Sequence, residues 1–163
     1  MTIFDFSFTV EASLSEVAGF HHDTSVLKRL TPPPIFAQIH TFEPLGEGSK
    51  AAFTLWFGPV PIRWEAVHTN VDQNGFTDTQ VRGPLKRWRH THRFAAINDS
   101  TTRVDEHIEY EHHAGLKGVA SRLLFSRLAL SFLFIARMLI TKRHLQRDSK
   151  RVQAAGNNER AAR

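Results

Sequence analysis

The sequence contains no cysteine among its 163 residues. This absence excludes disulfide frameworks, thiolate zinc sites and cysteine nucleophiles, and it favours a reducing compartment. We therefore expect a cytoplasmic protein, since residues 1–6 also lack the basic and apolar segments of an export signal. The Gly-x-Ser-x-Gly, phosphate-loop and dinucleotide-binding motifs are missing as well, which removes the main support for hydrolase, kinase and Rossmann functions.

The net charge of +5 belongs to one end of the chain. Residues 142–163 hold seven Lys or Arg against two acidic residues, so the preceding 141 residues are neutral. A neutral body argues against a nucleic-acid partner. We expect one domain over residues 1–147, long enough to bury its own core, followed by a basic, disordered tail over residues 148–163.

An apolar segment over residues 123–140 approaches the length of a membrane span, but Arg127 and Arg137 interrupt it. The nine uncharged residues between them cover about 14 Å as a helix, less than half of a hydrocarbon core of about 30 Å. The segment from about residue 118 to 146 is therefore predicted to form one long helix that does not cross a membrane. Its best-defined apolar stripe, predicted to face a sheet, is Leu124, Leu128, Phe132, Ile135 and Leu139.

More apolar residues occur on this helix than one stripe can hold, among them Leu130 and Phe134. A homodimer interface, a ligand or a membrane surface could cover them. Lys142, Arg143 and Arg147 follow directly and would suit anionic lipid. The sequence leaves these three possibilities open.

The rest of the chain predicts an α+β fold. Alternating apolar residues over 4–10 indicate a strand, and Ser13 with Glu16 forms a capping box that begins a short helix. A second short helix over 24–30 must end at the three prolines 32–34. Turn signals then separate consecutive strands from residue 35 to 113, too closely spaced for parallel crossovers. We expect an antiparallel sheet with the long C-terminal helix laid across one face.

Charge selects the register of the hairpin formed by residues 86–96 and 101–112. When opposed residue numbers sum to 198, three arginines face three carboxylates, whereas a sum of 196 opposes Arg93 to Arg103. The preferred register pairs Arg93 with Asp105, Arg89 with Glu109 and Arg87 with Glu111. It also gathers Trp88, His90, His92, Phe94, Glu106 and Tyr110 on the other, mostly apolar face, which should be concave.

Two segments and one residue pair resemble a known superfamily: FGPVPIRWEAVH at 57–68, GFTDTQVRGPLKRWRHTHRF at 75–94, and Glu109-Tyr110. They are similar to bacterial members of the SRPBCC superfamily, which includes START lipid-transfer domains and polyketide cyclase/dehydrase-like proteins. The resemblance covers about residues 3–145. It implies a helix-grip fold, a curved antiparallel sheet around one long C-terminal helix with short helices after the first strand. It also implies a pocket for an apolar small molecule or lipid, and no particular reaction.

His90 and His92 are the residues most suited to chemistry. Two residues apart on a strand, they share a face, and Glu106 beside them could complete a set of two histidines and one carboxylate. We favour a hydrogen-bonded polar cluster in the pocket wall over plain structural pairing, with a metal site as the weakest alternative, and expect no cofactor. His21-His22 and His112-His113 are interpreted as surface or element-end residues.

Arg82 ends a strand before Gly83-Pro84, where it could hold a ligand carboxylate or pair with Asp78. The preferred function is a carrier or sensor that binds an apolar ligand through Trp88, His90, His92, Phe94, Glu106, Tyr110, Arg82 and Asp78. Two alternatives remain, a cyclase/dehydrase-type enzyme that uses the pocket His and Glu residues, and a membrane or partner module that uses the apolar helix.

Overall fold

The computed structural model describes residues 1–23 and 25–161, with side chains through residue 146 except at position 117. Four helices and seven strands make up this part of the chain. In chain order they are β1 (Thr2–Val10), α1 (Leu14–His22), α2 (Val26–Arg29), β2 (Ile35–Phe42), β3 (Lys50–Phe57), β4 (Val60–Asp72), β5 (Gly75–Arg82), β6 (Arg87–Asn98), β7 (Thr101–Glu111), α3 (Lys117–Leu124) and α4 (Arg127–Ala161).

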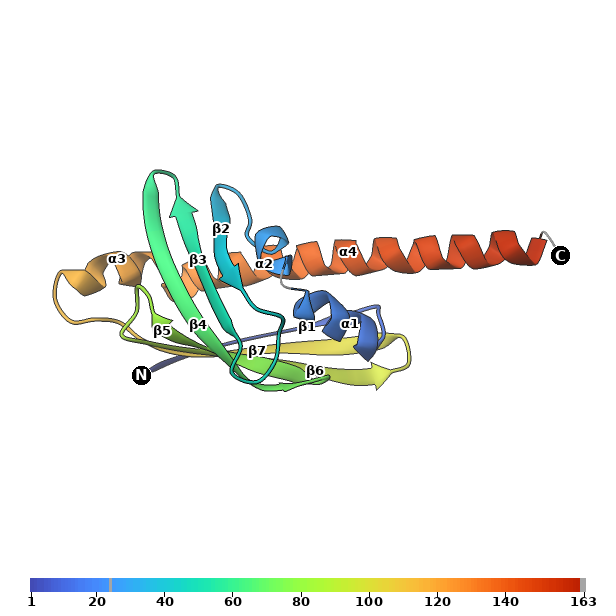
Figure 1. Cartoon of the computed structure of the whole chain (residues 1–163), viewed down its shortest axis with the longest axis horizontal. Coiled ribbons are helices and arrows are strands. Elements are labelled where there is room, and N and C mark those ends of the chain that lie inside the picture. The colour runs from blue at the N-terminus through green and yellow to red at the C-terminus, as the bar shows by residue number, and fades with distance from the viewer. Residues whose placement is uncertain (24, 162–163) are drawn as a thin grey trace.

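The seven strands form one antiparallel sheet in the order β1-β7-β6-β5-β4-β3-β2. The sheet curves around the first half of α4, while α1 and α2 lie beside it (Figure 1). β1 pairs with the last strand, so the N-terminal strand closes one edge of a meander of consecutive hairpins. The predicted α+β helix-grip architecture, with short helices after the first strand, is confirmed.

The predicted register of the β6–β7 hairpin is also confirmed, because opposed residues sum to 198 from Arg87↔Glu111 to Ala96↔Thr102. The ion pairs follow it only in part. Arg89 reaches Glu109 at 3.5 Å, whereas Arg93 pairs with Asp72 at 3.7 Å. Because an exposed ion pair contributes little free energy, a long arginine side chain can pair with any carboxylate within its reach.

The C-terminal helical segment is two helices where the sequence predicted one. α3 ends at Leu124, and the axis bends by 43° before α4 begins at Arg127. Phe125 is buried at this break against Trp64 and Trp88, and the Ser126 hydroxyl accepts a hydrogen bond from the Ala129 amide at 3.2 Å. The bend therefore combines a new helix cap with an aromatic anchor.

Of the five residues predicted to face the sheet, Leu124 at the end of α3 packs against the core, but the four on α4 do not. Leu128 and Phe132 are 85% and 65% exposed, and Ile135 and Leu139 also lie on the outer side. The opposite stripe, Leu130, Phe134, Thr141 and Leu145, is buried. Apolar residues occupy both sides of the helix, so their spacing alone could not choose between them.

Within the described residues, no single helix is long and apolar enough to span a membrane; only the bent pair of residues 118–124 and 127–146 meets that criterion jointly. α4 continues through residues 148–161, which the sequence analysis expected to be a disordered tail. The domain boundary at residue 147 and the cytoplasmic location stay predictions.

The core consists of two apolar clusters on the concave face of the sheet. One contains Phe8, Phe94, Val104 and residues of α1 and α2. The other contains Phe4, Trp64, Trp88, Ile108, Phe125, Leu130 and Phe134. Along β6 the clusters are separated by His90 and His92, and along β7 by Glu106, so a polar layer crosses the middle of the core.

Candidate functional site

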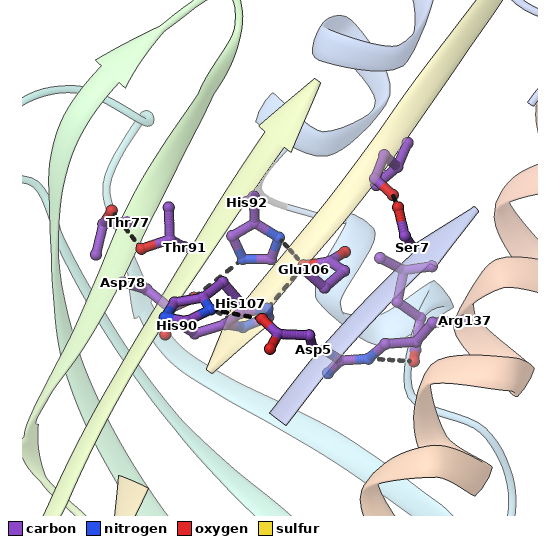
Figure 2. A network of polar contacts seen from close by, with 12 residues as sticks. Asp5, Ser7, Thr77, Asp78, His90, Thr91, His92, Glu106, His107 and Arg137 are labelled. Carbon is purple, nitrogen blue, oxygen red and sulfur yellow. Dashed lines mark hydrogen bonds and ion pairs between the residues drawn. The ribbon is translucent and has the colours of Figure 1, made fainter. Parts of the chain in front are cut away.

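The polar layer is built by three neighbouring strands. β5 contributes Asp78, β6 contributes His90 and His92, and β7 contributes Glu106. Asp78 lies directly opposite His90, and His92 directly opposite Glu106. Side chains two residues apart on a strand share a face, so all four point to the concave side (Figure 2).

Each imidazole ring contacts both carboxylates. Glu106 Oε2 lies 2.7 Å from His90 Nε2 and 2.8 Å from His92 Nδ1. Asp78 Oδ2 lies 3.1 Å from His92 Nε2 and 3.4 Å from His90 Nδ1. The predicted pairing of His92 with Glu106 is confirmed as an ion pair, although Nδ1 of His92 is not aligned for a hydrogen bond. Asp78, which the sequence offered as a partner of Arg82, belongs to this cluster instead.

The cluster sets the protonation states of its members. Burial alone would lower the pKa of His92, but the carboxylates of Glu106 and Asp78 outweigh it and raise that pKa to about 9. Burial would raise the pKa of both carboxyls, yet their contacts with the two imidazoles hold each pKa below its usual range. At neutral pH, the site therefore contains a His92 imidazolium between two carboxylates.

Arg137 on α4 is the residue that the sequence analysis missed. It lines the same cavity as the cluster, and its Nε donates a hydrogen bond to the Leu30 carbonyl at 3.3 Å (Figure 2). Its guanidinium carbon lies 5.2 Å from the centre of the Phe134 ring, within the range of a cation–π contact. Burial lowers the pKa of Arg137, and the negative charges of Glu106 and Asp78 oppose this effect. The signal was present in the sequence, because an arginine shares the stripe of Leu130 and Phe134.

Three further histidines line the cavity, His21, His22 and His68. His21, expected at the surface, is buried against Phe94 with ring centres 4.8 Å apart, and its Nδ1 donates to the Val17 carbonyl. Burial lowers the pKa of His21 to about 4, so this ring is neutral at pH 7. Burial also lowers the pKa of His68, which contacts the Ser49 hydroxyl through Nδ1 at 3.0 Å.

A cavity of about 150 Å³ lies between the sheet and the helices. Its wall is mostly apolar and includes eight polar residues: His21, His22, Asp23, His68, Asp78, His90, His92 and Arg137. The apolar and aromatic lining includes Val26, Leu27, Leu30, Phe42, Leu45, Ala51, Phe53, Leu55, Trp64, Ala66, Phe76, Trp88, Phe125, Leu133 and Phe134. A small set of polar groups in an apolar wall is typical of small-molecule sites.

The predicted site residues separate into three groups. Trp88, His90, His92 and Asp78 line the cavity, and Glu106 is buried in contact with both imidazoles. Phe94 and Tyr110 point inward as predicted, but they belong to the packed core. Arg82 lies at the surface, where it pairs with Glu65 at 3.5 Å.

A metal ion could be held by Asp78, His90 and His92, whose ligand atoms all lie within 4.8 Å of one another. The sequence had suggested Glu106 as the third ligand. Metal binding would have to displace the proton of His92, because only a neutral imidazole ligates. The expectation of no metal and no cofactor stays a prediction.

No protein-family model matches the chain, and no curated protein matches it. Solved structures do. The Zhui aromatase/cyclase from Streptomyces sp. R1128 superposes with a TM-score of 0.72 at 16% identity, covering 95% of this chain and 98% of that one. A START superfamily protein from Mycobacterium smegmatis gives 0.68 at 10% identity, over 89% and 97% of the two chains. Norcoclaurine synthase from Thalictrum flavum gives 0.64 at 15% identity, over 89% and 87%.

The chain thus has the helix-grip fold that START and aromatase/cyclase proteins share, as the resemblance to the SRPBCC superfamily implied. At these identities the likeness extends to the fold, while the bacterial origin remains a prediction.

Proposed function

We propose that this protein binds an apolar small molecule or lipid in the cavity between the sheet and α4, as a carrier or sensor does. The cavity itself carries the proposal: its wall is mainly aliphatic and aromatic, and its polar groups include His90, His92 and Arg137. An apolar body would bury surface against the aromatic wall, and a polar end would face these groups.

Native mass spectrometry of the protein purified from its own cells tests this proposal directly. A bound molecule should add a defined mass to the protein and should be lost on unfolding. The variant Ala66→Leu should reduce the bound fraction at least about tenfold, because Ala66 lines the cavity and three added carbons would fill part of it. Ala96→Leu, at an exposed position of β6, is the matched control. Equal ligand loads in both variants would contradict the proposal.

A cyclase or dehydrase activity is the second candidate, and one observation favours it. The His92 imidazolium, with its pKa raised to about 9, borders the cavity beside two carboxylates. Such a group could donate a proton to a ligand oxygen while Asp78, the carboxylate that lines the cavity, accepts one from carbon. The aromatase/cyclase and norcoclaurine synthase named above share this fold, and the chemistry here rests on the cluster.

The two candidates differ in their response to Glu106→Gln and His92→Gln. A carrier should keep its ligand affinity within about fivefold, because Glu106 does not line the cavity and His92 is one of several polar residues that do. An enzyme should lose turnover by at least about a hundredfold. The assay follows the co-purified molecule by liquid chromatography and mass spectrometry during incubation with fresh protein. An unchanged molecule would exclude this second candidate.

A further inference from the structure

The exposed sides of α3 and α4 both carry large apolar side chains. Seven large apolar side chains on this segment are at least 45% exposed, and Leu116, Leu123 and Leu128 exceed 70%. The others are Val119, Phe132, Ile135 and Leu139. On α4 the exposed positions follow a spacing of three or four residues, so they form one stripe opposite the buried stripe of Leu130 and Phe134. We call the seven residues the outer apolar face.

The charged side chains that α3 and α4 carry before Asp148 are all of one sign. The sequence contains no Asp or Glu between Glu111 and Asp148. Arg122 and Arg127 are exposed near the bend between the helices. Arg143 is exposed and follows Leu139 by four residues, so it lies one turn beyond the stripe on the same side of the helix. Lys142 lies beside it and is half-buried, at the rim of a hollow that it shares with Glu11, just after the edge strand β1. An apolar stripe bordered by cations fits a surface that is apolar inside and anionic outside.

We propose that the outer apolar face docks on the surface of an anionic lipid bilayer. The apolar side chains would enter the boundary between headgroups and acyl chains, and the cations would contact lipid phosphates. A second copy of this chain fits less well, since its own α3 and α4 would bring the same cations and no carboxylate before Asp148 to pair with them.

The position of the face gives docking a consequence for the cavity. Phe132 belongs to the outer apolar face, whereas the next two residues of α4, Leu133 and Phe134, line the cavity. Only the width of α4 therefore separates the outer apolar face from the binding site. Docking would place the cavity beside a source or acceptor of apolar molecules, although the docking proposal stands without any particular ligand.

Vesicle flotation of the full chain tests the proposal. Vesicles of phosphatidylcholine alone are compared with vesicles in which about one third of the lipid is phosphatidylglycerol. We expect flotation with the anionic vesicles, weakened by added salt because the cations contribute. The double variant Leu128→Gln and Phe132→Gln should bind at least about tenfold more weakly. The double variant Lys142→Gln and Arg143→Gln should lose about tenfold on anionic vesicles only.

Matched controls change exposed residues elsewhere. Val81→Thr with Ile97→Thr removes two exposed apolar side chains from the sheet, and Arg63→Gln with Arg87→Gln removes two exposed cations; both should float like the parent. Absence of the parent from both vesicle types would overturn the proposal, as would undiminished flotation of the Leu128 and Phe132 double variant. If the parent does not float but is a dimer by light scattering, and the Leu128 and Phe132 double variant is a monomer, the face would be assigned to a second copy instead.

Discussion

At the scale of single residues, the cluster of Asp78, His90, His92 and Glu106 is an arrangement in which burial and charge oppose each other. Four ionisable side chains in an apolar core would be costly if they were unpaired. Here each imidazole contacts both carboxylates. The cluster is therefore held by mutual neutralisation, and its contribution to stability depends on pH.

His92 should make the protein less stable at alkaline pH. The pKa of His92 in the folded protein, about 9, lies above its usual value of 6.5. The protonated ring therefore adds its full share to the free energy of unfolding below about pH 6.5, and this share is lost as the pH rises through 9. This loss amounts to at most about 3 kcal/mol of unfolding free energy. Urea titrations between pH 6.5 and 10 should show a shallower decline for His92→Gln than for the parent. His113→Gln should keep the parental slope, and parallel curves for all three proteins would refute the assignment.

His21 should act in the opposite direction. Its pKa is lowered to about 4 by burial, so the unfolded chain takes up the proton first and stability falls as the pH drops from about 6.5. The variant His21→Phe keeps an aromatic ring against Phe94 and removes the titration. We expect it to lose less unfolding free energy between pH 6.5 and 5 than the parent, as measured by urea denaturation. This window lies above the range in which the carboxyls of Asp78 and Glu106 titrate, because the pKa of each is held below its usual range.

At the scale of elements, α4 has two apolar sides with different roles. Phe134 is 1% exposed between Phe4 and His90, whereas Phe132 lies on the outer apolar face. Phe134→Ala should lower the free energy of unfolding by about 3–5 kcal/mol. Phe132→Ala should change it by less than about 0.5 kcal/mol. Chemical denaturation measures both variants, compared at equal dependence of the unfolding free energy on denaturant concentration. Similar losses of free energy would mean that α4 is rotated from this orientation.

The β4–β5 turn is tied to the site by backbone contact. Gly75 has a φ of +144°, and a Cβ at this position would lie 2.0 Å from the carbonyl oxygen of His92. Gly75→Ala should therefore cost about 2 kcal/mol or more of unfolding free energy. Gly46→Ala, where the nearest atom would be 3.9 Å away, is the control. Thermal unfolding followed by circular dichroism compares the two, and equal melting temperatures would contradict the packing at Gly75.

At the scale of the whole molecule, ligand and fold should be thermodynamically linked. A molecule that binds the cavity of the folded state stabilises that state by mass action, by about 2.7 kcal/mol at a hundredfold excess over its Kd. Protein unfolded in guanidinium, separated from its ligand and refolded should therefore melt at a lower temperature than protein as purified. Adding back the extracted molecule should restore the difference in the parent and much less of it in Ala66→Leu.

The sequence by itself determined the order of the elements, the antiparallel sheet and the β6–β7 register. The element order and the sheet follow from turn signals between short strands. The register follows from opposite charges that face each other across the two strands of one hairpin. It also brought His92 to Glu106, because that contact is a direct consequence of register.

Only the tertiary structure decided which contacts join distant segments. In the structure, Leu130, Phe134 and Arg137 of α4 face inward. Asp78 contacts the histidines while Arg82 pairs with Glu65, and His21 is buried. A helix with apolar residues on both sides has no preferred orientation until it meets a partner, and here the inward side places Arg137 on the same cavity as two buried carboxylates. Packing and charge between the curved sheet and α4 decided this orientation, and no local sequence pattern contains that information.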